Sequence, residues 1–193
     1  MRDKPDHYAL LARKEGYPAR SVYKLKEIQQ KFNVIPRKGK VLDIGAAPGS
    51  WTLYAAGLLK NRGTILSVDL KPFGIEKRPN MTFFTGDAFS DEFLELASDF
   101  GPFDSVISDA APSTTGNRTV DTGRSYTLAL KVIQTAGDLL AEGGSLVVKV
   151  FQGGDEHQLL SIVKNTYESA KLFKPKASRK ESFEIFIIGT GKK

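Results

Sequence analysis

Short apolar runs alternate with longer amphipathic stretches over most of this chain, from Lys40 onward. The apolar runs are rich in β-branched and aromatic residues and are bounded by Gly, Asp or Pro, as is typical of buried parallel strands. The stretches between them carry apolar residues at helical spacing. This alternation predicts an α/β fold, a doubly wound sheet with right-handed crossovers. The predicted strands are Val41–Gly45, Thr64–Leu70, Met81–Asp87, Phe103–Ala110 and Ser145–Phe151, and the predicted helices are Trp51–Leu59, Asp91–Phe100, Thr122–Ala141 and Glu156–Ser169.

The two ends of the chain follow other patterns. Residues 170–176 and 182–191 read as two strands with a short connection, which predicts an antiparallel pair at one edge of the sheet. The pattern of residues 6–33 indicates a helical segment. Gly143-Gly144 is expected to end the third of the predicted helices, Thr122–Ala141. We therefore expect a single domain over 1–193, with a basic helical extension (1–40) before the sheet (41–193).

Charge is unevenly distributed along the chain. Residues 1–40 carry eleven Lys/Arg against four Asp/Glu, residues 41–170 carry ten against sixteen, and residues 171–193 carry seven against two. Basic ends are compatible with solvated termini. They are equally compatible with an electrostatic footprint for a polyanion, in which Lys and Arg contact phosphates. Charge alone does not choose between these interpretations.

Composition excludes several classes of site. The chain has no cysteine, which leaves out disulfides, zinc–thiolate clusters and a thiol nucleophile. Its two histidines, His7 and His157, are far apart, so we expect no metal site. No apolar run approaches the ~20 residues of a membrane span, and the N-terminus lacks a signal-peptide pattern. We expect a cytoplasmic protein with no membrane partner.

A glycine-containing loop follows the first predicted strand, in the segment VLDIGAAPGSW. Gly45 and Gly49 keep side chains away from the backbone and from the next helix N-terminus, so that a ligand can approach. The spacing is not the G-x-G-x-x-G of dinucleotide enzymes, and the loop lacks the G-K-[ST] of a P-loop. Such a turn is weak evidence alone, since any strand-to-helix turn can use glycine.

Two acids at neighbouring strand ends make the glycine loop more specific. Asp69 ends the second predicted strand, where its carboxylate can accept from ribose hydroxyls. Asp87 ends the third, where it can accept from an adenine amino group. Each acid alone also fits a helix cap or a turn. Together with the loop, they predict a site for an adenosine without a pyrophosphate.

Five segments carry a family resemblance: SVYKLKEIQ, VLDIGAAPGSW, SVISDAAPSTTG, GGSLVVKVFQG and SRKESFEIFIIGTG. In this order they resemble the FtsJ/RrmJ family of RNA ribose 2′-O-methyltransferases, from about Tyr17 to the C-terminus. The resemblance implies a Rossmann-like, seven-stranded sheet, mostly parallel with an antiparallel last strand. It also implies S-adenosyl-L-methionine as cofactor and, for short bacterial-type members, ribosomal RNA within the large subunit as substrate. We expect a monomer.

The resemblance also implies roles for individual residues. The S-adenosylmethionine pocket would include Gly49, Trp51, Asp69, Asp87 and Asp109, beside Gly45 of the same loop. The family's Lys-Asp-Lys-Glu catalytic set falls on Lys24, Asp109, Lys149 and Glu184. Arg20 and Lys26, on the basic N-terminal segment, are expected to bind RNA. Family members often carry a second basic residue where this chain has Pro18, which removes one expected phosphate contact.

A ribose hydroxyl is a poor nucleophile until its proton leaves, so a general base is expected. Lys149 ends a buried strand, where desolvation and the neighbouring cation of Lys24 favour the neutral amine that can accept this proton. Alternative interpretations are a structural ion pair between Lys149 and Asp109, a solvated Lys24 and an exposed Glu184. Whole-protein alternatives are a nicotinamide-dependent oxidoreductase, a methyltransferase acting on tRNA, and a non-catalytic RNA-binding assembly factor.

Overall fold

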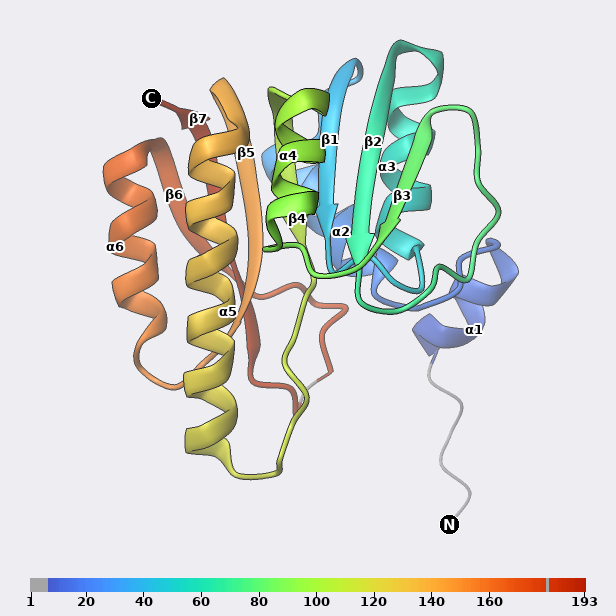
Figure 1. Ribbon diagram of the computed structural model, residues 1–193. Helices are drawn as coiled ribbons and strands as arrows, with labels where there is room; N and C mark the ends of the chain where they lie inside the picture. Colours follow the sequence, from blue (N-terminus) through green and yellow to red (C-terminus); the bar gives the residue numbers. More distant parts are fainter. Residues whose placement is uncertain (1–6, 180) are drawn as a thin grey trace.

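The computed structural model describes residues 7–179 and 181–193 and contains one seven-stranded sheet between two layers of helices (Figure 1). The spatial order of the strands is β3-β2-β1-β4-β5-β7-β6. The α/β class and the strand-by-strand alternation predicted from the sequence are confirmed. The strands are β1 (Gly39–Ile44), β2 (Gly63–Asp69), β3 (Met81–Thr85), β4 (Phe103–Ser108), β5 (Leu140–Phe151), β6 (Tyr167–Phe173) and β7 (Glu184–Lys192).

Strand β7 is the antiparallel member of the sheet. Strands β1 to β5 pair in parallel, whereas β7 lies between β5 and β6 and runs antiparallel to both. The predicted antiparallel last strand is therefore confirmed, with β6 at the edge of the sheet. In this register Lys149 of β5 pairs with Phe186, and Phe151 pairs with Glu184. The insertion of β7 thus brings Glu184 close to the carboxyl end of β5.

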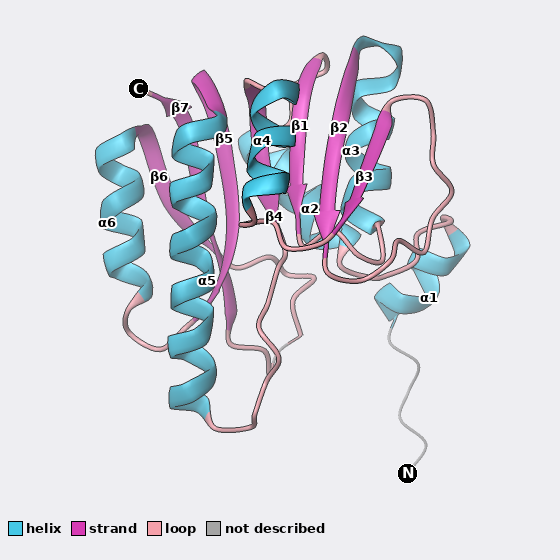
Figure 2. Cartoon of the chain, viewed as in Figure 1, coloured by secondary structure: helices cyan, strands magenta, loops and turns pink. Residues whose placement is uncertain are grey.

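Helices cover both faces of the sheet (Figure 2). One core lies between the sheet and α4, α5 and α6, and includes Phe93, Val132 and Leu159. The other lies between the sheet and α2 and α3, and includes Leu25 and Trp51. The described helices are α1 (His7–Lys14), α2 (Val22–Phe32), α3 (Ser50–Leu59), α4 (Asp91–Phe100), α5 (Arg118–Leu139) and α6 (Glu156–Thr166), with the short 3₁₀ turn η1 (Lys60–Arg62).

The boundaries of α5 differ from those predicted. Asn117 accepts a hydrogen bond from the backbone N–H of Val120 at 3.2 Å and caps the helix earlier than expected. At the other end, α5 stops at Leu139, and Gly143 and Gly144 lie inside β5 rather than after the helix. The chain enters the sheet directly because Leu140 already pairs with Phe103 of β4.

Two other predicted helices also differ in extent. The N-terminal helical segment is split into α1 and α2, because Gly16 has a φ of 78° and Pro18 follows it. Residues 1–6, the start of the predicted basic extension, lie outside the described residues. The last helix stops at Thr166, since the buried side chain of Tyr167 already belongs to β6.

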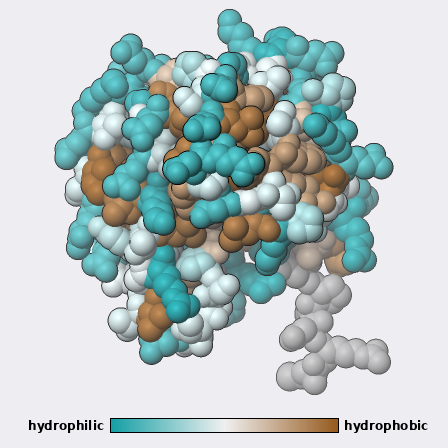
Figure 3. Space-filling view, viewed as in Figure 1, coloured by the Kyte–Doolittle hydropathy of each residue, from teal (hydrophilic) through white to brown (hydrophobic). Residues whose placement is uncertain are grey.

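The order of the strands leaves a crevice at the carboxyl edge of the sheet. The connections leaving β1 and β4 turn to opposite faces, and ligands of doubly wound sheets bind at such a point. Helix α1 lies beside this edge, near the loops that follow β1 and β2 (Figure 1). Hydrophilic side chains separate the apolar areas of the helical face in Figure 3. Among the described residues, no helix is long and apolar enough to cross a membrane.

Candidate active site

A cleft of about 490 Å³ lies at the carboxyl ends of β1, β2, β3 and β4. Its lining includes Gly45, Asp69, Asp87 and Asp109, so the structure brings together four of the residues singled out from the sequence. Its volume lies within the range of small-molecule sites. Gly49, at the end of the same loop, and Trp51, in the first turn of α3, do not line the cleft.

The turn after β1 is held in place by backbone hydrogen bonds. The N–H groups of Gly45 and Ala46 both donate to the carbonyl of Val68, at 2.9 and 3.1 Å. A Cβ added to Gly45, whose φ is 76°, would lie 2.5 Å from the Cβ of Ala110. Position 45 therefore requires glycine because the chain after β4 passes close to it. This reason adds to the one expected from the sequence, that glycine lets a ligand approach the backbone.

The loop then enters α3 at Gly49. This residue has a φ of 112°, and a Cβ there would lie 2.6 Å from the side chain of Ile75. The Gly49 carbonyl accepts from the N–H of Leu53, which leaves the first amides of the helix without intrahelical acceptors. A helix N-terminus with such amides favours partly negative ligand groups.

The side chain of Trp51 packs in the hydrophobic core. The indole is only 2 % exposed, donates from Nε1 to the carbonyl of Ser21 at 2.9 Å and packs on Phe186. Its backbone N–H lies in the first turn of α3. A cofactor contact from Trp51 stays a prediction, and it would involve the backbone rather than the ring.

The two acids at the ends of β2 and β3 are fixed by the backbone. Asp69 accepts from the N–H of Ala47 at 2.9 Å and from the N–H of Lys71 at 2.8 Å. Asp87 accepts from the N–H of Phe89 at 3.0 Å. Each carboxylate oxygen has a second lone pair with which to accept from a ligand. Anchored acceptors in a cleft of this size fit the hydroxyl and amino donors of an adenosine.

Asp43 is a residue near the cleft that the sequence reasoning missed. It lies beneath the glycine loop on β1, where Thr52 donates to it at 2.7 Å and in turn contacts Ser67 at 3.0 Å. Burial raises the pKa of Asp43 to about 7, against the opposing effect of the Thr52 hydrogen bond. The available signal was a charged residue inside an otherwise apolar strand pattern, VLDIG.

This buried acid predicts a pH dependence of stability. The folded-state pKa of Asp43, about 7, lies above the unfolded value of about 3.9, so the folded state retains a proton that the unfolded state releases. The free energy of unfolding should therefore fall as pH rises from about 4 to about 7, by at most about 4 kcal/mol. Asp43→Asn should lose this component in urea unfolding at a series of pH values. Asp138→Asn, at an exposed acid of α5, should retain it, and equal pH profiles for all three proteins would exclude Asp43 as the source.

Lys24, Asp109, Lys149 and Glu184 meet next to the cleft. They come from α2, the end of β4, β5 and β7, respectively. Lys149 Nζ lies 2.9 Å from Asp109 Oδ1, and Lys24 Nζ lies 2.6 Å from Glu184 Oε1 and 3.8 Å from Asp109 Oδ1. Lys149 also donates to the carbonyl of Asp109. The four predicted positions therefore form one cluster, and Asp109 belongs to both the cluster and the cleft.

Opposite charges balance one another within this cluster. Burial acts to raise the pKa of Glu184, but Lys24 and Lys149 outweigh it, and the net pKa is lowered. Lys149 and Glu184 are each 8 % exposed, so neither group is a simple solvated charge. The arrangement can hold a hydroxyl-bearing substrate near an amine whose partner, Asp109, also faces the cleft.

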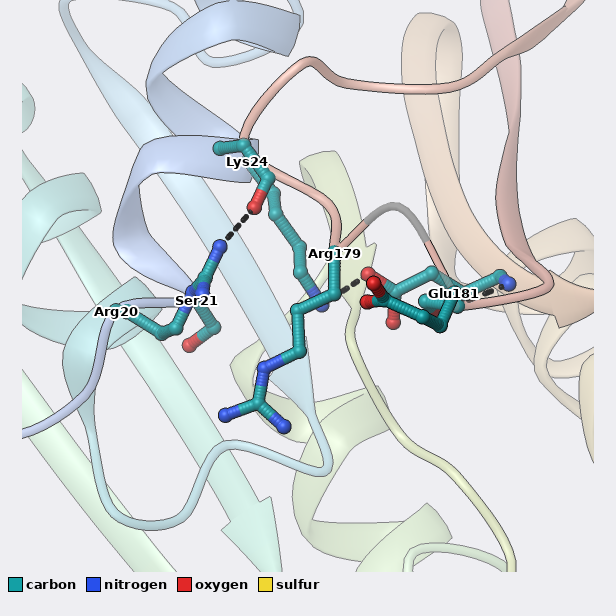
Figure 4. A pocket seen from close by; sticks show the side chains of 8 residues that line it. Arg20, Ser21, Lys24, Arg179 and Glu181 are labelled. Atoms are coloured by element: carbon teal, nitrogen blue, oxygen red, sulfur yellow. Dashed lines mark hydrogen bonds and ion pairs between the residues drawn. The ribbon is translucent and has the colours of Figure 1, made fainter. Parts of the chain in front are cut away.

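A second pocket, of about 510 Å³, includes Lys24 and Glu184 in its lining. In Figure 4, Arg20 and Lys24 enter it from the α2 side, and Arg179 and Glu181 enter from the segment before β7. The Arg20 guanidinium donates to the carbonyl of Ala177. The structure thus places Arg20 at the edge of the cluster and adds Arg179, which lies in the resemblance segment SRKESFEIFIIGTG but was not singled out there.

Lys26 lies elsewhere. Its ammonium is paired with Glu15 and lies over the rings of Tyr17 and Tyr23, at 4.7 and 4.9 Å from their centroids. These contacts tie α2 to the chain that follows α1. RNA binding by Lys26 stays a prediction, and the contacts in the structure give this residue a structural role.

Comparisons with known proteins identify the family of this chain. The family model described as FtsJ-like methyltransferase matches residues 17–192. A protein of Treponema denticola named Ribosomal RNA large subunit methyltransferase E is 47% identical over 188 residues, which cover 96% of this chain and 94% of that protein. A protein of the same name from Desulforapulum autotrophicum is also 47% identical, with coverage of 97% and 93%.

Solved structures show the same fold. A Plasmodium falciparum protein assigned as a ribosomal RNA methyltransferase superposes with a TM-score of 0.79 at 27% identity, covering 91% of this chain and 98% of that one. The motif segments, the order of the strands and the cluster of Lys24, Asp109, Lys149 and Glu184 lead to the same assignment as the family model. The chain belongs to the FtsJ-like methyltransferase family.

Proposed function

We propose that this protein methylates a ribose 2′-hydroxyl of large-subunit ribosomal RNA, with S-adenosylmethionine as methyl donor and Lys149 as general base. The observation that carries the proposal is the double position of Asp109. This residue lines the cofactor-sized cleft and lies 2.9 Å from the amine of Lys149. A base in this position is next to the place where a bound methyl donor meets its acceptor.

The cleft residues fit the cofactor by their chemistry. Asp69 would accept from the ribose hydroxyls of the cofactor and Asp87 from its adenine amino group, beside the loop from Gly45 to Gly49. When bound, S-adenosylmethionine supplies an electrophilic methyl group. The protein's own contribution is to orient the two substrates and to exclude water from the reacting atoms.

The cluster provides a path for the proton. The substrate 2′-hydroxyl would lie against Lys149, whose amine, after its own proton has passed to solvent, would take the hydroxyl proton as the oxygen–methyl bond forms. Asp109 holds the resulting ammonium, and Lys24, held by Glu184 at 2.6 Å, stabilises the negative charge that develops on the oxygen. In the products the methyl group is on the ribose oxygen, the methyl donor has become S-adenosylhomocysteine, and the proton is on Lys149, from which it passes to solvent.

The proposed substrate follows from what the chain has outside its sheet. Outside the sheet, the described residues of α1, α2 and their connections bring basic side chains, which suit contacts with phosphates. Phosphate contacts position a protein without reading sequence, so such contacts would recognise a shape that the substrate already has. A folded ribosomal particle supplies such a shape, and the curated relatives are named for the large subunit.

The test is a methylation assay on large ribosomal subunits, deproteinised ribosomal RNA and total tRNA from a strain lacking the protein. We expect label to enter the subunits, and nucleoside mass spectrometry to find a 2′-O-methylated ribose. Preferred methylation of tRNA would overturn the substrate, a methylated base would overturn the chemistry, and equal rates on subunits and bare RNA would overturn the argument from shape. Absence of transfer to any RNA would favour a non-catalytic assembly factor.

Asp87→Ala gives a separate test of the cofactor site. Loss of a hydrogen bond to the adenine amino group costs about 1–3 kcal/mol, or roughly 5- to 150-fold in affinity. Calorimetry with S-adenosylhomocysteine should show this loss, while affinity for RNA stays as in the wild type. Asp99→Ala, at an exposed acid of α4, should bind both as the wild type does. Unchanged affinity in Asp87→Ala would remove Asp87 from the site.

A further inference from the structure

We propose that the groove between α1 and the segment joining β2 to β3 is a second RNA-backbone site, which binds phosphates of the strand flanking the methylated nucleotide. The proposal rests on the proposed function in that RNA is the substrate. It assigns a binding role to Arg13, Lys77 and Arg78, residues that neither the motifs nor the cluster of Lys24, Asp109, Lys149 and Glu184 include.

The groove has the charge of a polyanion site. Its volume is about 780 Å³, and residues from α1, the following turn and residues 74–78 line it. Glu76 is its one acidic lining residue among those described. The basic lining residues are Arg13, Arg20, Lys77, Arg78 and Arg179. Five cations around one carboxylate favour a chain of phosphates over a neutral ligand.

The groove is continuous with the active site. Arg20 and Arg179 line both the groove and the pocket of Figure 4, and that pocket also contains Lys24 and Glu184. A strand whose ribose lies at Lys149 therefore has a basic path past Arg20 and Arg179 into the groove. The groove shares no lining residue with the cofactor cleft, so the two ligands do not compete for it.

One wall of the groove is anchored to the glycine loop. The N–H of Gly74 donates to the carbonyl of Pro48 at 3.1 Å, and the side chain of Ile75 packs over Gly49. These contacts fix the start of the segment that presents Lys77 and Arg78. The two cations are exposed, as phosphate-binding side chains need to be.

The other wall is anchored to α2. The pair between Lys26 and Glu15 ties α2 to the chain just after α1, and the N–H of Tyr17 donates to the carbonyl of Ala12 at 2.9 Å. Arg13, exposed in the last turn of α1, is thereby held at a defined position. Because both walls are fixed, phosphate contacts there can set the register of the strand without reading its bases.

The test compares two charge-reversal variants of equal net charge. Lys77→Glu with Arg78→Glu changes the groove. The matched control, Lys60→Glu with Arg62→Glu, changes two exposed cations of η1, at the opposite end of β2. Fluorescence anisotropy would follow the binding of labelled oligouridylates, a trinucleotide and a dodecamer, over a range of KCl concentrations. Circular dichroism and thermal unfolding would check that both variants are folded.

The groove variant is expected to bind the dodecamer at least about 10-fold more weakly at about 0.1 M salt, with the salt slope reduced by about 1.4, or 0.7 for each lost phosphate contact. The trinucleotide, too short to occupy both sites, should bind both variants nearly alike. In methylation assays on ribosomal RNA, KM should rise while kcat at saturating RNA stays unchanged, because the cluster around Lys149 is intact.

Two results would overturn the proposal. Equal weakening in both variants would mean that net charge, and not the groove, sets RNA affinity. Unchanged binding of the dodecamer, including the case where only binding to ribosomal particles is weakened, would mean that the groove does not hold RNA. Binding is measured without methyl transfer. Failure to find a 2′-O-methylated ribose would therefore refute the proposed function, whereas RNA binding by the groove would still be decided by the anisotropy measurements.

Discussion

Replacing Lys149 by alanine is expected to lower the rate of methyl transfer at saturating RNA and cofactor by about 10²- to 10⁴-fold. The reason is the loss of the amine that takes the proton of the 2′-hydroxyl. Lys149 is 8 % exposed at the end of β5 and lies 2.9 Å from Asp109. Single-turnover transfer of labelled methyl groups to RNA measures this step directly.

Cofactor binding serves as the internal control for this variant. Calorimetry should find nearly wild-type affinity for S-adenosylhomocysteine in Lys149→Ala, since the Lys149 side chain does not line the cleft. Lys164→Ala, at an exposed lysine of α6, should have the wild-type rate. A Lys149→Ala protein that kept more than about a tenth of the wild-type rate would contradict general-base assistance.

Asp109→Ala is expected to lower both the rate of methyl transfer and the free energy of unfolding. Its carboxylate pairs with Lys149 and lies 3.8 Å from Lys24, so its loss leaves two largely buried cations with Glu184 as their remaining partner in the cluster. Removing one member of a buried pair costs about 3 kcal/mol, and the solvent that still reaches this site reduces that figure somewhat. Activity should fall at least as far as in Lys149→Ala, because the amine is also no longer oriented.

A double-mutant cycle separates the two effects. In urea unfolding, Asp109→Ala with Lys149→Met should be destabilised by less than the sum of the single changes, since the double variant leaves no unpaired ammonium at position 149. Strict additivity would show that the two side chains contribute independently to stability. The matched control for the loss of a carboxylate is Asp138→Ala, because Asp138 is exposed. Asp104→Ala is unsuitable, because Asp104 accepts a hydrogen bond from the N–H of Lys40.

Much of the cofactor cleft could be predicted from local patterns. Strand periodicity located the carboxyl ends of the parallel strands, and the topology of a doubly wound sheet brings such ends to one edge. Gly45, Asp69 and Asp87 lie at the ends of predicted strands, and all three line the cleft. Their proximity required only the order of elements in the chain. Asp109 also lines the cleft, but its role there came from the family resemblance.

Residues from outside the parallel sheet could not be placed in this way. Lys24 comes from α2 and Glu184 from β7, and no local pattern indicates that β7 inserts beside β5. Their joint role came from family resemblance alone. Arg179 and Lys77 were missed, because a groove whose walls come from separate segments has no single sequence signature. Lys26 was singled out as a basic residue of a helix, but its position in the sequence does not reveal its ion pair with Glu15.

The position of β7 also has a consequence for the order in which the molecule can form. Strand β7 is the last described element along the chain, yet it lies inside the sheet with neighbours on both sides. Until it is in place, β5 presents an unpaired edge, and such edges invite pairing with other chains. The ion pair between Lys24 and Glu184 joins residues that are far apart in the sequence, and contacts of this kind form slowly. After dilution from denaturant, we therefore expect methyl transfer to recover later than helical content.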